Sequence, residues 1–169
     1  QRSYDHIFHD ALLQDIPLVY CMDRAGVVGP DGPTHHGVFD INFMKSVPNM
    51  IVAAPKDGDE LYDLLKTAIS EKLFISLRYP KEKTKFTINR EPRRITIGTW
   101  EKINKGKRIC ILAVGSMVEI CKKALFEINK TCNINVTLIN CRFIKPIDYN
   151  MIDNLILEHN IFLTFEEGL

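Results

Sequence analysis

The amino-acid sequence predicts an α/β protein with two parallel-sheet domains and helices on both faces of each sheet. Three observations lead to this class. Short continuous apolar runs of strand length recur along the chain, as expected for strands that are buried on both faces. Segments with apolar residues at helical spacing lie between these runs, which favours parallel strands joined by crossover helices. A basic, irregular segment at 81–108 divides the pattern into two blocks.

The first block begins with a predicted helix. Its apolar residues follow helical spacing from Tyr4 to Leu12, and Pro17 ends it. Between the last two strands of this block, Asp57 and Asp59 open a second helix, where carboxylates suit the helix dipole. The buried strands themselves are predicted at the apolar runs 18–22, 50–54 and 73–77.

The segment that separates the blocks is strongly basic. Residues 81–108 hold ten Lys or Arg against three Asp or Glu, with no sustained periodicity, which predicts a solvated linker. Nucleic-acid binding would need aromatic residues between the basic ones, and only Phe86 and Trp100 are present. The linker therefore joins two predicted domains, residues 1–80 and 109–169. The second domain predicts strands at 109–114, 136–139 and 161–165, with helices around 118–128 and 152–156.

The composition excludes several classes of protein. The chain has 169 residues, 46% of them hydrophobic, and a net charge of +1, so neither nucleic acid nor a membrane surface is predicted as a partner. Its longest apolar runs are too short to span a bilayer. Five scattered cysteines without a C-x-x-C spacing indicate buried free thiols in a reducing compartment.

The stretch from Asp23 to Asp40, DRAGVVGPDGPTHHGVFD, is the candidate site. It follows the predicted strand 18–22, and ligands of open parallel sheets bind outside the carboxyl ends of the strands. Its glycines let the backbone approach a ligand, and its prolines stiffen the loop. Arg24 carries the planar fork that binds phosphate or carboxylate, and Arg78 ends another predicted strand. The two guanidinium groups predict a clamp for an anionic substrate.

The titratable groups of this loop allow more than one interpretation. Asp31 and His35 could share a proton or orient a substrate hydroxyl. Arg24 could instead only pair with Asp23 or Asp31 and tie the loop down. No metal site is predicted at His35 and His36, because adjacent side chains diverge and no third ligand has a suitable spacing.

The last predicted strand is followed by two carboxylates, Glu166 and Glu167. Such a pair at a strand end can act as a general acid, but the sequence shows no base or nucleophile nearby. We therefore predict that these residues turn the chain towards a following helix.

Seven pieces of the sequence follow one another in an order typical of one enzyme family: QRSYDHIFHD (1–10), PLVYCMDRAGVVGPDGPTHHGVFD (17–40), PNMIVAAP (48–55), LRYP (77–80), ILAVGS (111–116), RFIKPID (142–148) and FEEG (165–168). With these pieces the chain resembles the 1-deoxy-D-xylulose-5-phosphate synthase family, thiamine-diphosphate enzymes of the transketolase superfamily. The catalytic subunits of 2-oxo-acid dehydrogenases share the architecture but resemble the chain less well.

The resemblance implies a fold and an activity. Residues 1–80 would be the later part of a transketolase-like pyrimidine-binding domain, and residues 109–169 the first part of a transketolase C-terminal domain. Members of the family condense pyruvate with D-glyceraldehyde 3-phosphate and release CO2, which supplies isoprenoid, thiamine and pyridoxal synthesis. Their cofactors are thiamine diphosphate and Mg2+, and they are homodimers.

The resemblance also implies roles for five residues. Arg24 and Arg78 match arginines that hold the phosphoryl group of the substrate, and Arg2 matches a further arginine that contacts substrate. Asp31 and His35 match a catalytic pair near the cofactor that positions the intermediate and assists proton transfer.

Other family features have no counterpart in this sequence. The catalytic glutamate, the Gly-Asp-Gly motif and the metal-ligating Asp and Asn are expected upstream of Gln1, in a missing N-terminal domain of the same enzyme. We assign no cofactor-binding or metal-binding residue to the chain, and we expect the 169 residues alone to be inactive. Two alternatives remain open: a β-type subunit of a 2-oxo-acid dehydrogenase, and a non-catalytic chain that keeps only the fold.

The bias towards Ile, Lys and Asn, which A/T-rich codons encode, leaves two compartments open. One is the relict plastid of an A/T-rich eukaryote, and the other is the cytoplasm of a bacterium.

Overall fold

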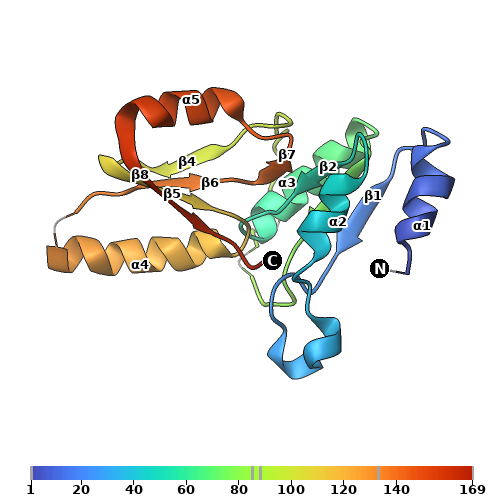
Figure 1. The fold of residues 1–169 in the computed structure, drawn as a ribbon, viewed down its shortest axis with the longest axis horizontal. Helices are drawn as coiled ribbons and strands as arrows, with labels where there is room; N and C mark the ends of the chain where they lie inside the picture. Colours follow the sequence, from blue (N-terminus) through green and yellow to red (C-terminus); the bar gives the residue numbers. More distant parts are fainter. Residues whose placement is uncertain (1, 85, 88, 133, 169) are drawn as a thin grey trace.

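The computed structural model describes residues 2–84, 86–87, 89–132 and 134–168, and within them the chain forms two four-stranded sheets (Figure 1). Three neighbouring strands of each sheet are parallel, which confirms the predicted α/β class. The first sheet has the order β1 (Val19–Met22), β3 (Ile75–Arg78), β2 (Ile51–Ala53), β7 (Phe143–Lys145). The second has the order β4 (Glu101–Asn104), β6 (Thr137–Asn140), β5 (Arg108–Ala113), β8 (His159–Phe165).

One edge strand of each sheet runs antiparallel, which the sequence did not predict. β7 pairs with β2, and β4 pairs with β6. These strands have only three and four residues, too few for a clear period-2 pattern. Because β7 belongs to the second half of the chain, that half completes the sheet of the first.

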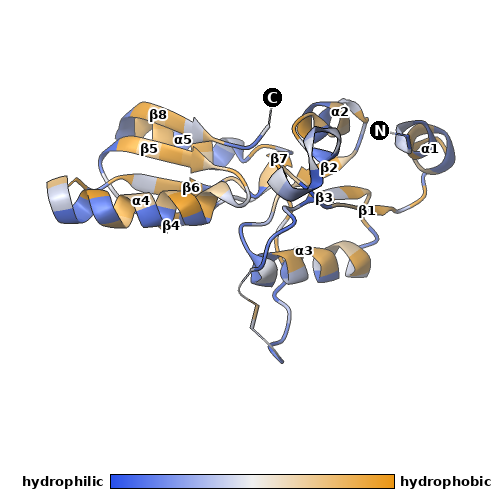
Figure 2. Ribbon diagram, turned by 90° about the horizontal axis from the view of Figure 1, so that it is seen from below, coloured by the Kyte–Doolittle hydropathy of each residue, from blue (hydrophilic) through white to orange (hydrophobic). Residues whose placement is uncertain are grey.

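Helices cover both faces of the first sheet (Figure 2). On one face lie α1 (Tyr4–His6), its π-helical continuation η1 (Ile7–Leu12) and α2 (Asp40–Ser46). On the other lies α3 (Gly58–Ser70). The predicted start of α3 is set by Asp57, whose carboxylate accepts a 2.8 Å hydrogen bond from the backbone N–H of Glu60. The sequence missed α2, since seven residues are too few to establish a helical period.

The second sheet lies between two helices (Figure 1). α4 (Met117–Cys132) packs on one face through Val118, Cys121 and Leu125. α5 (Tyr149–Glu158) packs on the other through Leu155. The prediction of helices on both faces is therefore confirmed for this sheet as well.

The segment 81–108 is more ordered than the predicted solvated linker. It contains β4, and Trp100 is only 9% exposed, with its indole Nε1 donating to the carbonyl oxygen of Phe143 at 2.8 Å. Ile95 and Trp100 belong to one apolar cluster with residues of both sheets. The second part of this segment therefore packs between two units of the chain. The first unit is residues 2–80, and the second is residues 109–168.

Two burial patterns differ from the sequence-based prediction. β1 is an edge strand with Cys21 exposed, so it is not covered on both faces. All five cysteines are free, but only Cys110, Cys121 and Cys141 are buried. Burial raises the pKa of Cys110 to about 11, which keeps that thiol protonated and unreactive near neutral pH.

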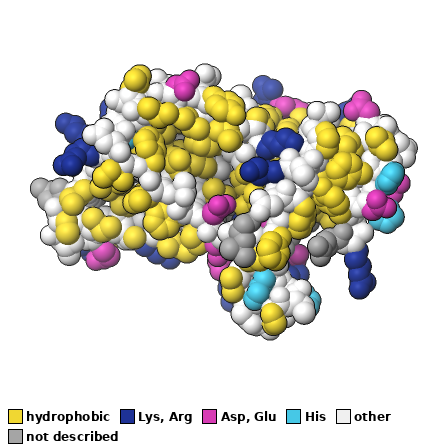
Figure 3. All heavy atoms as spheres, viewed as in Figure 1, with side chains coloured by type: hydrophobic (Ala, Val, Ile, Leu, Met, Phe, Trp, Pro, Cys, Tyr) yellow, Lys and Arg dark blue, Asp and Glu magenta, His cyan; other side chains and the backbone are white. Residues whose placement is uncertain are grey.

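Apolar side chains also reach the surface of the second sheet. Figure 3 shows hydrophobic groups gathered over this half of the molecule. The contribution of β8 is Ile161, Phe162, Leu163 and Phe165, each 38–44% exposed. No helix within the described residues is long and apolar enough to cross a membrane.

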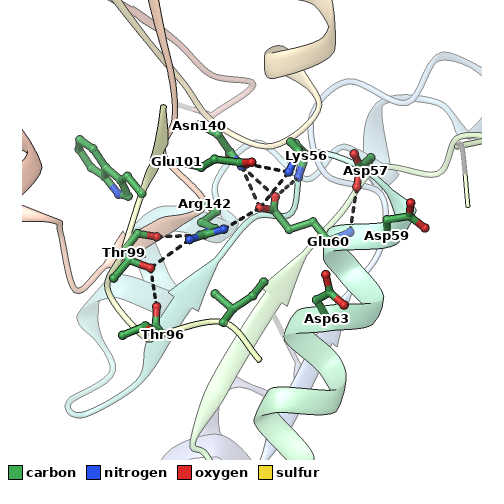
Figure 4. Close-up of polar contacts among 12 residues, drawn as sticks. Lys56, Asp57, Asp59, Glu60, Asp63, Thr96, Thr99, Glu101, Asn140 and Arg142 are labelled. Atoms are coloured by element: carbon green, nitrogen blue, oxygen red, sulfur yellow. Dashed lines mark hydrogen bonds and ion pairs between the residues drawn. The ribbon is translucent and has the colours of Figure 1, made fainter. Parts of the chain in front are cut away.

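A polar network joins α3 and the loop before it to the second sheet and the residue Arg142 that follows β6 (Figure 4). Its centre is Glu60 of α3, which is 3% exposed. Glu60 Oε1 accepts a 2.9 Å hydrogen bond from the Asn140 amide and lies 3.3 Å from both Lys56 Nζ and Arg142 Nη1. Lys56 also pairs with Glu101 of β4 at 2.8 Å. Two residues of the first unit are thus bound to two of the second and to Glu101 of β4.

Neighbouring charges favour the ionised forms of Lys56 and Glu101 in this interface. Burial alone would lower the pKa of Lys56, but the negative charge of Glu60 beside it raises the pKa above its usual value. Burial opposes ionisation of Glu101, and the hydrogen bond from Lys56 outweighs it and lowers the pKa of this carboxyl. Removing any one charge would leave the others uncompensated.

The Glu60→Ala variant should lose about 3–5 kcal/mol of unfolding free energy, because it leaves the mostly buried side chains of Lys56 and Arg142 without their shared carboxylate. Urea denaturation of the two proteins measures the difference. The matched control is Glu127→Ala, which removes an exposed helix pair with Lys130 and should change stability by less than about 0.5 kcal/mol. Equal losses in both variants would contradict the central role of Glu60.

Candidate functional site

The loop 23–40 leaves the carboxyl end of β1 and is closed at its base by two glycines. Gly26 N–H donates to Gly37 O at 3.0 Å, and Gly37 N–H donates back to Gly26 O at 2.9 Å. Gly26 has φ +77°, and a Cβ on Gly37 would overlap the carbonyl oxygen of Arg24, so both positions require glycine. Two 3₁₀ turns, Gly29–Asp31 and Pro33–His35, shape the tip.

Arg24 lies inside the loop and binds two of its carboxylates. Its Nε donates to Asp31 Oδ2 at 2.7 Å, and its Nη1 pairs with Asp23. This is the pairing that the sequence left open as an alternative to substrate binding. The side chain keeps 34% of its surface exposed, so the structure leaves room for a second role, and the clamp stays a prediction.

Asp31 is held between two cations. Besides Arg24, Lys81 approaches within 2.7 Å of its carboxylate. The hydrogen bonds from Lys81 and then Arg24 lower the pKa of Asp31 below its ordinary value. Asp31 is therefore ionised at neutral pH and can accept a hydrogen bond but cannot donate a proton. Sequence reasoning missed Lys81, although it directly follows the quoted motif LRYP.

The two histidines of the loop differ in their surroundings. His35 is exposed, and its Nδ1 lies 3.0 Å from Thr34 Oγ1. In the described part of the chain no hydrogen bond joins it to Asp31, so their cooperation stays a prediction. His36 Nδ1 accepts a 2.9 Å hydrogen bond from the backbone N–H of Val28, which gives this residue a structural role within the loop.

Arg78 ends β3 and is 3% exposed. Its Nε donates to Asp40 Oδ2 at 2.7 Å, and its Nη2 donates to the carbonyl oxygens of Gly37 at 3.1 Å and Glu167 at 2.8 Å. One guanidinium thus binds the base of the loop, the first residue of α2 and the segment after β8. Sequence reasoning missed Asp40 as its partner, although this residue ends the quoted loop.

The predicted clamp residues share the loop base but not the same environment. Gly37 O accepts hydrogen bonds from both Gly26 N–H and Arg78 Nη2. Because Gly26 lies two residues after Arg24, only a few covalent and hydrogen bonds separate Arg24 from Arg78. A cavity of about 1050 Å³ opens next to the loop, between the units, and neither arginine lines it. Its walls include Asp23, Tyr79, Lys81, Ser116 and Glu167.

The remaining predicted site residue, Arg2, is exposed ahead of α1, and its substrate role stays a prediction. Gln1, which begins the same motif, lies outside the described residues. Within the described ranges no group of three or more His, Cys, Asp or Glu side chains could hold a metal ion.

Two family models together match most of the chain. Residues 1–87 match the pyrimidine-binding domain of transketolase, and residues 98–169 match the transketolase C-terminal domain. The protein is thus built from two domains of thiamine-diphosphate-dependent enzymes, and it belongs to the transketolase family. The predicted boundaries at 80 and 109 lie close to these limits and stay a prediction.

Within this family the chain is similar to 1-deoxy-D-xylulose-5-phosphate synthases. It is 44% identical to the synthase of Dictyoglomus thermophilum over the whole chain and 44% identical to that of Aquifex aeolicus over 99% of it. Synthase 1 of Geobacter sulfurreducens is 43% identical over 99% of the chain. The resemblance found in the motifs is therefore confirmed. The chain spans 26–27% of the length of these relatives.

Solved structures support the fold. A split-gene transketolase, described as an inactive tetramer of four beta chains, superposes with a TM-score of 0.83 and 21% identity. The match covers 99% of this chain and 54% of that one. The transketolase of Campylobacter jejuni gives a TM-score of 0.68 and 18% identity, covering 88% of this chain and 24% of its own.

The Lys81→Ala variant should raise the pKa of Asp31 towards its ordinary value, because the largest cause of the lowered pKa is removed. A carboxyl ¹³C NMR titration measures the change. In the unchanged protein, the stabilisation by this ion pair should be fully present at pH values above the ordinary Asp pKa. It should be lost as the pH falls through the lowered pKa that Asp31 has in the folded protein. Lys66→Ala, an exposed change on α3, is the control; the same shift in both variants would exclude Lys81 as the cause.

Proposed function

We propose that this chain forms part of a 1-deoxy-D-xylulose-5-phosphate synthase, which condenses pyruvate with D-glyceraldehyde 3-phosphate and releases CO2. The observation that carries the proposal is the 44% identity to such synthases over the whole chain, including the loop 23–40. When bound, thiamine diphosphate would supply the electron sink for decarboxylation. The residues of this chain would bind and orient the phosphorylated aldehyde.

The charges around the loop fit that task. Arg24 and Lys81 are cationic groups that flank one carboxylate at the carboxyl end of the first sheet. Arg24 would offer its exposed edge to the substrate phosphate. Ionised Asp31 would accept a hydrogen bond from a substrate hydroxyl, with His35 as the partner for proton transfer. Arg78 would contribute from the buried side of the loop, because its guanidinium donates to Gly37 O and so fixes the loop base.

The relatives' length bears on how the proposal is tested. Because the chain spans 27% of the Dictyoglomus synthase, pyruvate and the aldehyde phosphate are proposed as substrates of the full-length enzyme, with the missing domain as partner and a homodimer as the assembly. The plastid or bacterial cytoplasm stays a prediction for the compartment, and the relatives named above are bacterial.

The full-length enzyme should release CO2 from pyruvate in a reaction that depends on D-glyceraldehyde 3-phosphate, thiamine diphosphate and Mg2+. Trapping of ¹⁴CO2 from labelled pyruvate measures this, and the 169-residue chain assayed alone should show no turnover. CO2 release that does not depend on the aldehyde and requires a lipoyl carrier would favour the dehydrogenase alternative. Absence of release from the full-length enzyme would leave only the non-catalytic alternative.

In the full-length enzyme, Arg24→Ala should raise KM for the aldehyde phosphate about ten- to a hundredfold, since a hydrogen bond to a charged group contributes about 1.5–3 kcal/mol. Steady-state kinetics gives KM, and fluorescence titration gives the Kd of thiamine diphosphate, which should hardly change. The control is Arg94→Ala, which removes an exposed arginine paired with Glu71. Equal losses for both ligands would refute the role of Arg24.

A further inference from the structure

The segment after β8 rests directly on the base of the candidate loop. A Cβ built on Gly26 would meet Glu167 Cδ at 2.8 Å and Glu167 Cβ at 2.9 Å. A Cβ on Gly168 would meet Ile41 Cδ1 at 3.1 Å. The second unit therefore packs against both the start of the loop and the helix that follows it. Glu167 takes the space that any side chain larger than glycine would need at position 26.

Glu167 is itself held at both ends. Its Oε2 accepts a 2.6 Å hydrogen bond from Ser116 Oγ, just ahead of α4. A carboxylate at this end of a helix is also favoured by the helix dipole. Its carbonyl oxygen accepts from Arg78 Nη2, the same nitrogen that donates to Gly37 O. One residue is thus tied to α4 by its side chain and to the loop base by its backbone.

We propose that Glu167 is a positioning residue, by which the C-terminal domain fixes the loop that binds the phosphorylated aldehyde. This inference rests on the function proposed above. The two carboxylates after β8 would then have different roles, since Glu167 packs on the loop whereas Glu166 is exposed. Glu167 does not need to touch the substrate: it acts through Gly26, which lies two residues after Arg24, the residue that would bind the phosphate.

The experiment uses the full-length enzyme and compares Glu167→Ala with Glu166→Ala. Glu167→Ala should raise KM for D-glyceraldehyde 3-phosphate about tenfold and leave kcat and KM for pyruvate within about twofold. Glu166→Ala should leave all three unchanged. Glu167→Gln should restore the low KM, because its amide oxygen can still accept from Ser116. A kcat that falls together with melting temperature in Glu167→Ala, with no change in KM, would reduce the residue to a structural one and overturn the proposal.

Two double variants test the route of the effect. Ser116→Ala should raise KM in the wild-type background but add nothing to Glu167→Ala, because both changes remove the same bond. Gly26→Ala should raise KM by pushing Glu167 aside, and Glu167→Ala should then add little to it. Strictly additive effects in both pairs would contradict the inference.

A readout without turnover separates this inference from the proposed function. Hydrogen–deuterium exchange of peptides covering 23–40 should speed up in Glu167→Ala, because the amides of Gly26 and Gly37 lose their support, while peptides covering 109–114 stay protected. If the wild-type enzyme shows no aldehyde-dependent turnover, the proposed function fails and the exchange result still decides whether Glu167 holds the loop. Unchanged exchange at 23–40 would falsify the positioning role.

Discussion

The buried carboxylate of Glu60 is the interaction on which the arrangement of the two units depends. Glu60 lies in the first turn of α3, and its carboxylate contacts Asn140 at the end of β6 and Arg142 just after that strand. Removing the Glu60 carboxylate and its two cationic partners, Lys56 and Arg142, from water is costly. The contact is therefore favourable only when all the partners are in place. That requirement makes the network specific: a shifted interface would leave charges unpaired. The orientation of the second unit, and with it the segment after β8 that touches Gly26, follows from this constraint.

The candidate site is organised by hydrogen bonds to backbone more than by side-chain pairs. The loop 23–40 is closed by two glycines, and the carbonyl oxygen of Gly37 accepts from both the backbone N–H of Gly26 and Arg78. Because Arg78 is almost fully buried, it can hold this geometry without being available to bulk water. Arg24, Asp31 and Lys81 lie further out and remain partly exposed. The site thus combines a buried inner frame with an outer layer of paired charges.

The sequence predicted those features that local pattern determines. Apolar runs identified the parallel strands, Asp57 marked the start of α3, and the alternative pairing of Arg24 with Asp23 and Asp31 could be read from their proximity along the chain. The contacts of Lys81, Asp40 and Glu167 were not predicted, because each joins residues far apart in the chain. Asp40 and Glu167 lie 38 and 89 residues from Arg78, and Lys81 lies 50 residues from Asp31. β4 and β7 were missed because short edge strands carry no period of their own and form only where a longer strand offers an edge.

The antiparallel pairing of β7 with β2 has a consequence for how the protein is made. The first sheet contains a strand that is synthesised more than sixty residues after β3, since β3 ends at Arg78 and β7 begins at Phe143. On the ribosome, the edge of β2 therefore stays open until most of the chain has emerged. The first sheet is therefore completed only after β7 has been synthesised, so its last edge depends on the second half of the chain.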